Sequence, residues 1–213
     1  KWFVEEFQND EVGLVLKTNM AKNCLMDRES CEGRLKGLMS SLPKDRKCKI
    51  YLLHGDMSDA EMHAMYTHKN LSALVAIPHG EGYGLPIFEA AYSGMPVVSV
   101  GWSGQLDFLC NENGRENFYS VSYDIKKVPE EVVWPGVLIA ESGWAHAREV
   151  SYKENIRQCY EDLQSNSGHV AKAEVYATEL HERFEESKMY EKFVSALGLD
   201  LEWANDLSKI EIL

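Results

Sequence analysis

Short apolar runs alternate with amphipathic stretches along the first two thirds of the chain. Nearly continuous apolar runs lie at 12–17, 49–53, 73–78 and 97–101. Runs of this length without polar alternation are typical of strands buried on both faces of a parallel sheet. Helical spacing in between predicts helices at 29–41, 58–68, 86–93 and 105–109. The alternation predicts an α/β fold, a Rossmann-like parallel sheet with helices on both faces.

The rest of the chain has a different character. A last strand is expected at 118–123 and a long loop at 126–143, followed by helices at 145–163, 170–187 and 190–197. We expect one α/β domain over 1–165, and over 166–213 a C-terminal helical tail that packs on it. The helical spacing of Phe3, Val4 and Phe7 places a helix at the start and indicates that a further segment precedes Lys1.

The composition and net charge of the chain indicate which kinds of molecule it can bind. Hydrophobic residues make up 45% of the chain, enough for a packed core, and 22 basic against 34 acidic residues give a net charge of −12. This charge argues against nucleic acid and anionic membranes as partners, so an anionic ligand would need a site built from backbone groups.

The cysteines and the lengths of the apolar runs indicate the cellular compartment. The five cysteines are odd in number and form no Cys-x-x-Cys pair, which favours reduced thiols. There is no apolar run of the ~18 residues that a transmembrane segment needs, and the start does not resemble a signal peptide. We therefore expect a cytoplasmic protein without a transmembrane segment.

The densest cluster of glycines follows the predicted strand at 73–78. His79-Gly80-Glu81-Gly82-Tyr83-Gly84 leads directly into the helix that starts near Pro86. Glycines let a backbone approach a ligand closely, and unpaired amides at a helix start attract anions. Ligands in open α/β sheets also bind at this end of the strands. A purely structural turn between strand and helix is the alternative.

Two carboxylates flank these amides. Glu81 lies in the loop and Glu89 about one turn into the helix, so both would border one crevice. Carboxylates accept hydrogen bonds from sugar hydroxyls while amides hold phosphate, a combination that suits a nucleotide sugar. For Glu89 alone, favourable charge near a helix N-terminus is the simpler interpretation.

The residues from Glu81 to Val98 resemble a known signature. The run EGYGLPIFEAAYSGMPVV is similar to the EGFGLPxxEAxxxGxPVV motif of retaining GT-B glycosyltransferases, especially glycosyltransferase family four. The resemblance extends back through 53–58 with Glu61 and Tyr66, and forward to the loop at 101–104. It covers roughly residues 1–165 and implies the donor-binding, carboxyl-terminal half of a GT-B enzyme.

The resemblance implies a role for each matched residue. Glu81 would be the catalytic residue and face the donor sugar, and Glu89 would bind the ribose. The loop from Gly55 to Ser58, with Met57, would border the base. The diphosphate and sugar would be held by the amides of Gly82, Tyr83, Gly84 and Leu85.

The implied reaction transfers a sugar from a nucleoside-diphosphate sugar to a glycan or lipid-linked saccharide, as in polysaccharide biosynthesis. It retains the anomeric configuration and uses neither a metal nor a cofactor. His54, His63 and His68 have no carboxylate partners at metal spacing along the sequence, which also argues against zinc.

The departures from the family limit this interpretation. The family's first strand, its Arg and Lys for the diphosphate, and its amino-terminal acceptor domain are expected upstream of Lys1, so this chain alone would be an incomplete enzyme. Its exposed domain face would favour self-association. Lys17, at a strand end, would contact phosphate or be solvated, and His79 would touch donor or acceptor or only cap the loop.

Other functions remain open. A non-catalytic nucleotide or sugar-binding module would keep the same loop, and a sugar-nucleotide epimerase would use the same fold. A phosphorylase is disfavoured because its cofactor lysine motif is not found.

Overall fold

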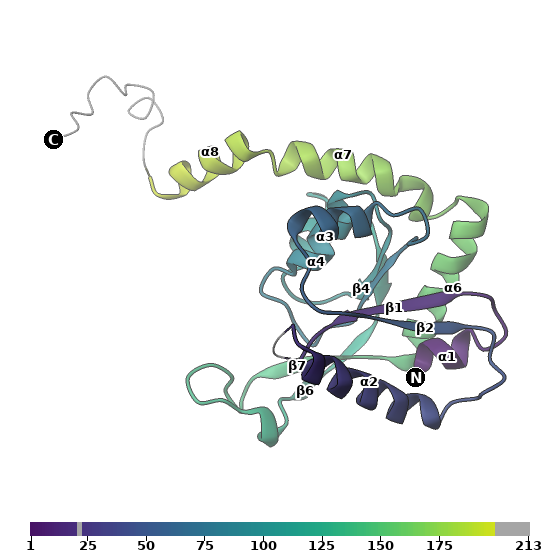
Figure 1. Ribbon diagram of the computed structural model, residues 1–213. Helices are drawn as coiled ribbons and strands as arrows, with labels where there is room; N and C mark the ends of the chain where they lie inside the picture. The colour runs from purple at the N-terminus through teal and green to yellow at the C-terminus, as the bar shows by residue number, and fades with distance from the viewer. Residues whose placement is uncertain (21–22, 199–213) are drawn as a thin grey trace.

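A computed structural model describes residues 1–20 and 23–198 of the chain (Figure 1). The protein is an α/β structure with parallel sheets, as the alternating pattern predicts. The strands are β1 Gly13–Thr18, β2 Lys49–His54, β3 Leu74–Ala76, β4 Val97–Val100, β5 Tyr119–Val121, β6 Tyr123–Lys127 and β7 Gly143–Ala147. The α-helices are α1 Trp2–Glu6, α2 Leu25–Ser40, α3 Asp59–Tyr66, α4 Leu85–Tyr92, α5 Leu106–Leu109, α6 Glu149–Ser165, α7 Ala173–Arg183 and α8 Glu186–Ala196. Short 3-10 turns lie at Glu130–Val132 and Val170–Lys172.

The best-packed region is the three-stranded parallel sheet β3–β4–β5. All four residues of β4 are buried, with Val98 and Val100 at 0% exposure. Val98 packs into a hydrophobic cluster with residues of α1 and α6. Val97 packs into a second cluster with residues of α4, α5 and α7. This sheet therefore has helices on both faces, which explains why its strands lack polar alternation.

The second parallel sheet, β1–β2, is separate from the first. Leu14 of β1 and Ile50 of β2 pack against the same cluster as Val98 and Val75, so both sheets share the layer formed by α1 and α6. Within the described residues, however, no ladder joins β1 to β3. The single sheet expected from the sequence is thus in two parts.

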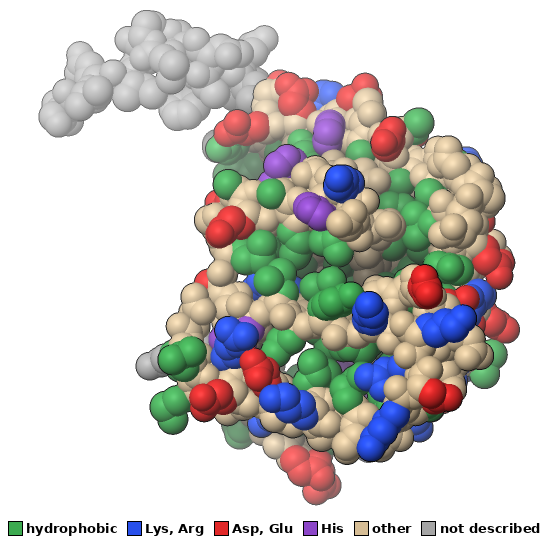
Figure 2. All heavy atoms as spheres, turned by 45° about the vertical axis from the view of Figure 1, so that its right-hand side comes forward, with side chains coloured by type: hydrophobic (Ala, Val, Ile, Leu, Met, Phe, Trp, Pro, Cys, Tyr) green, Lys and Arg blue, Asp and Glu red, His purple; other side chains and the backbone are tan. Residues whose placement is uncertain are grey.

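A cavity of about 710 Å³ lies on the opposite face of β1–β2. Its lining includes Val15 and Leu53 from the strands and Met65 from α3. Figure 2 shows hydrophobic side chains gathered along a hollow that crosses the middle of the molecule. This face of β1–β2 is covered less completely than either face of β4, and the central residues of β1 are only half-buried.

The predicted loop at 126–143 and the start of the predicted helix at Ala145 are wrong in part. β6 and β7 form an antiparallel hairpin in which Ile125 pairs with Ala145, and the α6 helix begins only at Glu149. The Arg148 N–H donates to the Ser122 carbonyl at 2.8 Å, which keeps the chain extended up to that point. The short alternation in Gly143–Ala147 runs directly into a strong helical pattern, and the helical pattern masked it.

The C-terminal helices differ in how they pack. α7 buries Tyr176, Ala177 and Leu180 and lies against α4, whereas α8 has no buried residue and extends away from the sheets in Figure 1. The predicted tail runs on to 213, and its residues 199–213 lie outside the described part of the chain. None of the described helices has the length and apolar character to cross a bilayer.

Candidate functional site

Two loops meet at the carboxyl ends of the neighbouring strands β3 and β4. The glycine-rich loop follows β3, and the loop at 101–105 follows β4. The Ser103 hydroxyl donates to the Glu81 carbonyl at 2.7 Å and accepts from the Glu81 N–H at 3.1 Å, while the Gly104 N–H donates to the same carbonyl. A Cβ at Gly104 would overlap the Gly82 carbonyl, so only glycine permits this contact. The second loop therefore fixes the backbone of the first.

The glycine-rich loop ends in a row of unpaired amides. Gly84 has φ +87° and caps α4, accepting from the N–H groups of Ile87 and Phe88 at 2.9 Å each. Among residues 1–20 and 23–198, no acceptor pairs with the amides of Gly82, Tyr83, Gly84 and Leu85. Amides at the start of a helix attract negative groups through their hydrogens and the helix dipole. The site thus offers an anion several donors without a basic side chain.

The Tyr83 side chain anchors this loop on the core. Its ring packs 5.1 Å from the ring of Phe108 and 5.6 Å from that of Phe88, centroid to centroid. Burial raises the pKa of the Tyr83 hydroxyl. The contribution of Tyr83 to the site is therefore its backbone amide, and its side chain holds that amide in place.

His79 is held by the β6–β7 hairpin. Its Nδ1 lies 2.7 Å from the Ala145 carbonyl, its own carbonyl accepts from the Ala145 N–H, and its ring stacks on Trp144 at 4.8 Å. The His146 ring also packs against the His79 ring. Burial, together with the nearby His79 and Lys126, lowers the pKa of His146. Of the two roles considered for His79, these contacts match the capping of the loop.

The two carboxylates predicted to share a crevice differ in burial and in their neighbours. Glu81 is half-buried, with its backbone bonded to Ser103, and its Cβ and Cγ lie near Gly84. Glu89 is exposed and borders a cavity of about 230 Å³ between α3 and α4. Burial and the nearby Glu89 carboxylate raise the pKa of Tyr66 to about 12. Glu89 lines this cavity together with Tyr66 and Phe88, whereas Glu81 is not part of its lining.

The remaining predicted residues gather at the ends of β1 and β2. The Lys17 ammonium donates to the carbonyl of Gly55. Gly55 is a buried residue with φ +103°. Met57 lies in the same loop as Gly55 and lines the 710 Å³ cavity. Lys17 therefore ties the end of β1 to the loop after β2, and its charge is partly shielded.

One cluster beside this loop was not found from the sequence. His54, at the end of β2, lies 2.9 Å from a carboxylate oxygen of Asp27, so it does have a carboxylate partner. The two residues are 27 positions apart, and only the fold brings them together. The one signal available was the spacing of Asp27 and Cys31, which puts both on one face of a helix.

Comparisons with known proteins found no match for this chain. No model of a protein family matches the chain, and no curated protein or solved structure matches it. The geometry of the site and the resemblance of its loop are therefore the basis for function.

Proposed function

We propose that this chain is the donor-binding portion of a retaining glycosyltransferase, which takes its sugar from a nucleoside-diphosphate sugar. The unpaired amides of Gly82–Leu85 would hold the diphosphate. Glu81, beside them, would face the sugar, and Glu89 would bind the ribose hydroxyls from the first turns of α4.

The observation that carries this proposal is the row of unpaired amides at the start of α4, held by Ser103 and Gly104. A diphosphate suits such a row because its charge is spread over several oxygens, each an acceptor. The 230 Å³ cavity beside Glu89 is smaller than the ~300–1,000 Å³ of typical small-molecule sites, so it would take only part of a ligand, such as a sugar ring.

The finer fold assignment belongs to the same proposal. The order β2-β1 on one side and β3-β4-β5 on the other matches the doubly wound order 3-2-1-4-5-6 with strand 1 left out. The shared α1–α6 layer supports this interpretation, as do the edges of β1 and β3 that no strand of the described chain pairs with. The strand that the family resemblance places before α1 would lie between β1 and β3 and complete a Rossmann-like sheet. The acceptor would be bound by a separate domain.

A non-catalytic nucleotide-binding module is the second candidate. It is favoured by the hydrogen bond from the Lys17 ammonium to the Gly55 carbonyl. Because of this bond, the ammonium that could have contacted a phosphate already has a partner within the chain. Such a module would bind the bare nucleotide as well as the sugar nucleotide.

Calorimetric titration of the chain with UDP, GDP and ADP, and with their glucose or mannose conjugates, tests the proposal. We expect saturable binding of one base family. Glu89→Ala should weaken binding of both the nucleotide and its sugar conjugate. Glu81→Ala should chiefly remove the preference for the sugar conjugate over the bare diphosphate.

Two control variants separate a ligand contact from a structural effect. Tyr66→Phe removes a hydroxyl that borders the same 230 Å³ cavity as Glu89 and should weaken nucleotide affinity less than Glu89→Ala does. Glu161→Ala removes an exposed carboxylate on α6 and should leave the affinity unchanged. If Glu161→Ala weakens binding as much as Glu89→Ala, the loss is a general effect of charge and the ribose assignment fails. Absence of binding to every nucleotide would contradict the proposed function.

A further inference from the structure

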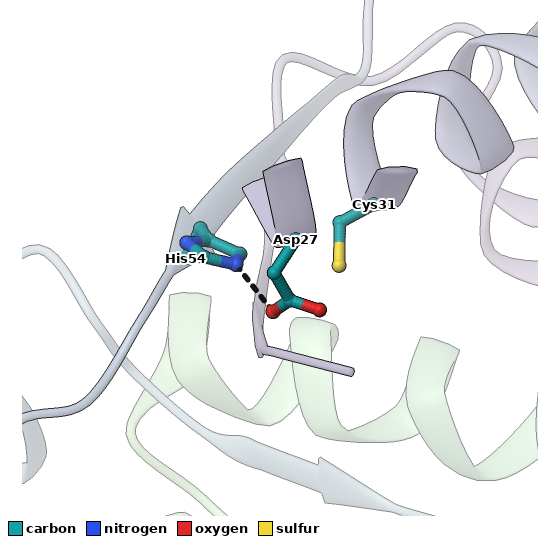
Figure 3. Close-up of side chains that lie close together, drawn as sticks. All are labelled: Asp27, Cys31 and His54. Carbon is teal, nitrogen blue, oxygen red and sulfur yellow. Dashed lines mark hydrogen bonds and ion pairs between the residues drawn. The ribbon is translucent and has the colours of Figure 1, made fainter. Parts of the chain in front are cut away.

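Asp27, Cys31 and His54 form a compact cluster of three metal-binding side chains. Asp27 and Cys31 are one turn apart on α2, and His54 is the last residue of β2. The ligand atoms of the three side chains all lie within 4.8 Å of one another. Figure 3 shows the Asp27 carboxylate between the His54 ring and the Cys31 sulfur. The cluster lies outside the glycine-rich loop.

The cluster is shielded from solvent. The side chains of His54 and Asp27 are 7% and 8% exposed, and Cys31 as a residue is 8% exposed. The Asp27 carboxylate accepts from the Met20 N–H at 2.9 and 3.2 Å and contacts His54 Nε2 at 2.9 Å. The backbone around Met20 therefore orients the carboxylate, as partners outside the ligand set commonly do at metal sites.

We propose that these three residues bind a zinc ion. Thiolate, imidazole and carboxylate are the ligands that zinc prefers, and three protein ligands with one open position is a common arrangement. Zinc–ligand bonds of about 2.0–2.3 Å put tetrahedral ligand atoms roughly 3.5 Å apart. Only side-chain adjustments are needed to reach this spacing from the present one.

The charges of the cluster suit a divalent cation. Loss of the thiol proton from Cys31 gives a thiolate, and with the Asp27 carboxylate this balances two positive charges beside a neutral imidazole. A neutral complex avoids the large cost of burying an unpaired charge. On binding, the contact of His54 with Asp27 would be replaced by bonds from both residues to zinc, and the Cys31 proton would go to solvent.

The ion would fasten α2 to the loop that follows β2. Gly55 comes directly after His54, and the Asn23 side chain lies so close to Gly55 that a Cβ there would collide with it. Zinc at this point would hold the start of α2 against the end of β2. This proposal is independent of the proposed glycosyl transfer.

Cobalt(II) spectroscopy of the metal-free chain tests the site, because Co²⁺ replaces Zn²⁺ in sites with nitrogen, oxygen and sulfur ligands. Added Co²⁺ should give a sulfur-to-cobalt charge-transfer band and strong ligand-field bands at one equivalent, and added Zn²⁺ should displace them. Cys31→Ser should abolish the charge-transfer band. His54→Gln and Asp27→Asn should weaken affinity at least ~10-fold.

Matched controls come from the same region of the chain. Cys24→Ser changes an exposed thiol at the start of α2, and His63→Gln changes an exposed ring on α3, so both should leave the spectrum unchanged. Circular dichroism of each variant checks folding. Absence of the charge-transfer band in the parent chain, or its persistence in Cys31→Ser, would overturn the proposal and leave Asp27 and His54 as a structural pair.

Discussion

The central strand β4 and the two strands of the β1–β2 sheet come from similar apolar runs and differ sharply in burial. All four residues of β4 are buried, whereas β1 has no buried residue and β2 alternates between exposed and half-buried positions. β4 has a strand on each side and helices on both faces, while β1 pairs, within residues 1–20 and 23–198, only with β2 and faces the 710 Å³ cavity. Burial of a parallel strand therefore depends on its neighbours more than on its own hydrophobicity.

The two groups of candidate residues belong to these two sheets and are held in different ways. The glycine-rich loop follows β3, and hydrogen bonds to the loop after β4 fix it. The loop after β2 is held instead by polar side chains, namely Lys17 on Gly55 and His54 on Asp27. Rigid support in the first case favours ligand binding, since backbone donors must stay in place to be useful.

Phe108→Ala should produce the largest effect that the comparison predicts. Its ring is fully buried among Tyr83 and Phe88, so truncation should cost about 3–5 kcal/mol of unfolding free energy. Leu53→Ala, which lines the cavity and is 37% exposed, should cost only about 1 kcal/mol. Urea denaturation measures both. Equal losses would show that the two sheets contribute equally to the core.

Tyr119→Phe should come next and should depend on pH. The Tyr119 hydroxyl donates to Asp162 at 2.7 Å and joins β5 to α6. Burial raises the pKa of Asp162, but hydrogen bonds from Tyr119, Ser167 and Gln158 outweigh it and lower the pKa overall. Loss of a bond to a charged group should cost about 1.5–3 kcal/mol at pH 7.

The sign of the pH effect follows from that lowered pKa. The ordinary pKa of an aspartate, as in the unfolded chain, is about 4. A carboxylate whose pKa is lowered in the native state stabilises the fold above that pH and loses this contribution as the pH falls through the native pKa. The difference between parent and Tyr119→Phe should therefore shrink from pH 7 to pH 3 in urea titrations. Tyr160→Phe is the control, since in the described chain its hydroxyl makes no hydrogen bond. A difference independent of pH would contradict the assignment.

Gly104→Ala should destabilise the protein by about 1–3 kcal/mol, because its methyl group would overlap the Gly82 carbonyl and push the two loops apart. Gly33→Ala is the matched control on α2, where a Cβ meets nothing within 4 Å, and it should stabilise by about 0.5–1 kcal/mol. Thermal unfolding compares the two variants. Stabilisation by Gly104→Ala would mean that the loops are not in contact.

Hydrogen exchange provides the mildest test, because it changes no residue. Amides of β4 pair on both sides and should exchange more slowly than those of β1, which has one unpaired edge. Equal protection of β1 and β4 would contradict the open edge between the two sheets.

Much of the fold was predictable from the sequence, and the reasons for the failures are specific. The four apolar runs predicted the strands β1 to β4 because continuous hydrophobicity and breaks by glycine and proline are local signals, and a fifth strand was expected where β5 lies. The strand β7 was missed because the helical pattern starts immediately after it, and its partner β6 was missed with it because most of β6 lies beyond the expected strand at 118–123. The division into two sheets was not foreseeable, since no local signal says which strands pair.

The candidate site was predictable in its backbone more than in its side chains. The glycines at 82 and 84 and the proline at 86 predicted a loop that leads directly into a helix, and α4 begins there. The position of Glu89 beside Tyr66, and the pairing of His54 with Asp27, depend on contacts between distant segments. Neither has a local pattern that would have revealed it.

The most direct test of the central claim is an amide NMR titration of the chain with a nucleoside diphosphate, repeated with the matching sugar nucleotide. We expect saturable shifts concentrated at the amides of Gly82, Tyr83, Gly84 and Leu85, with smaller changes near Glu89. Saturable shifts confined to other parts of the molecule, or no shift at these four amides with any of the nucleotides, would contradict it.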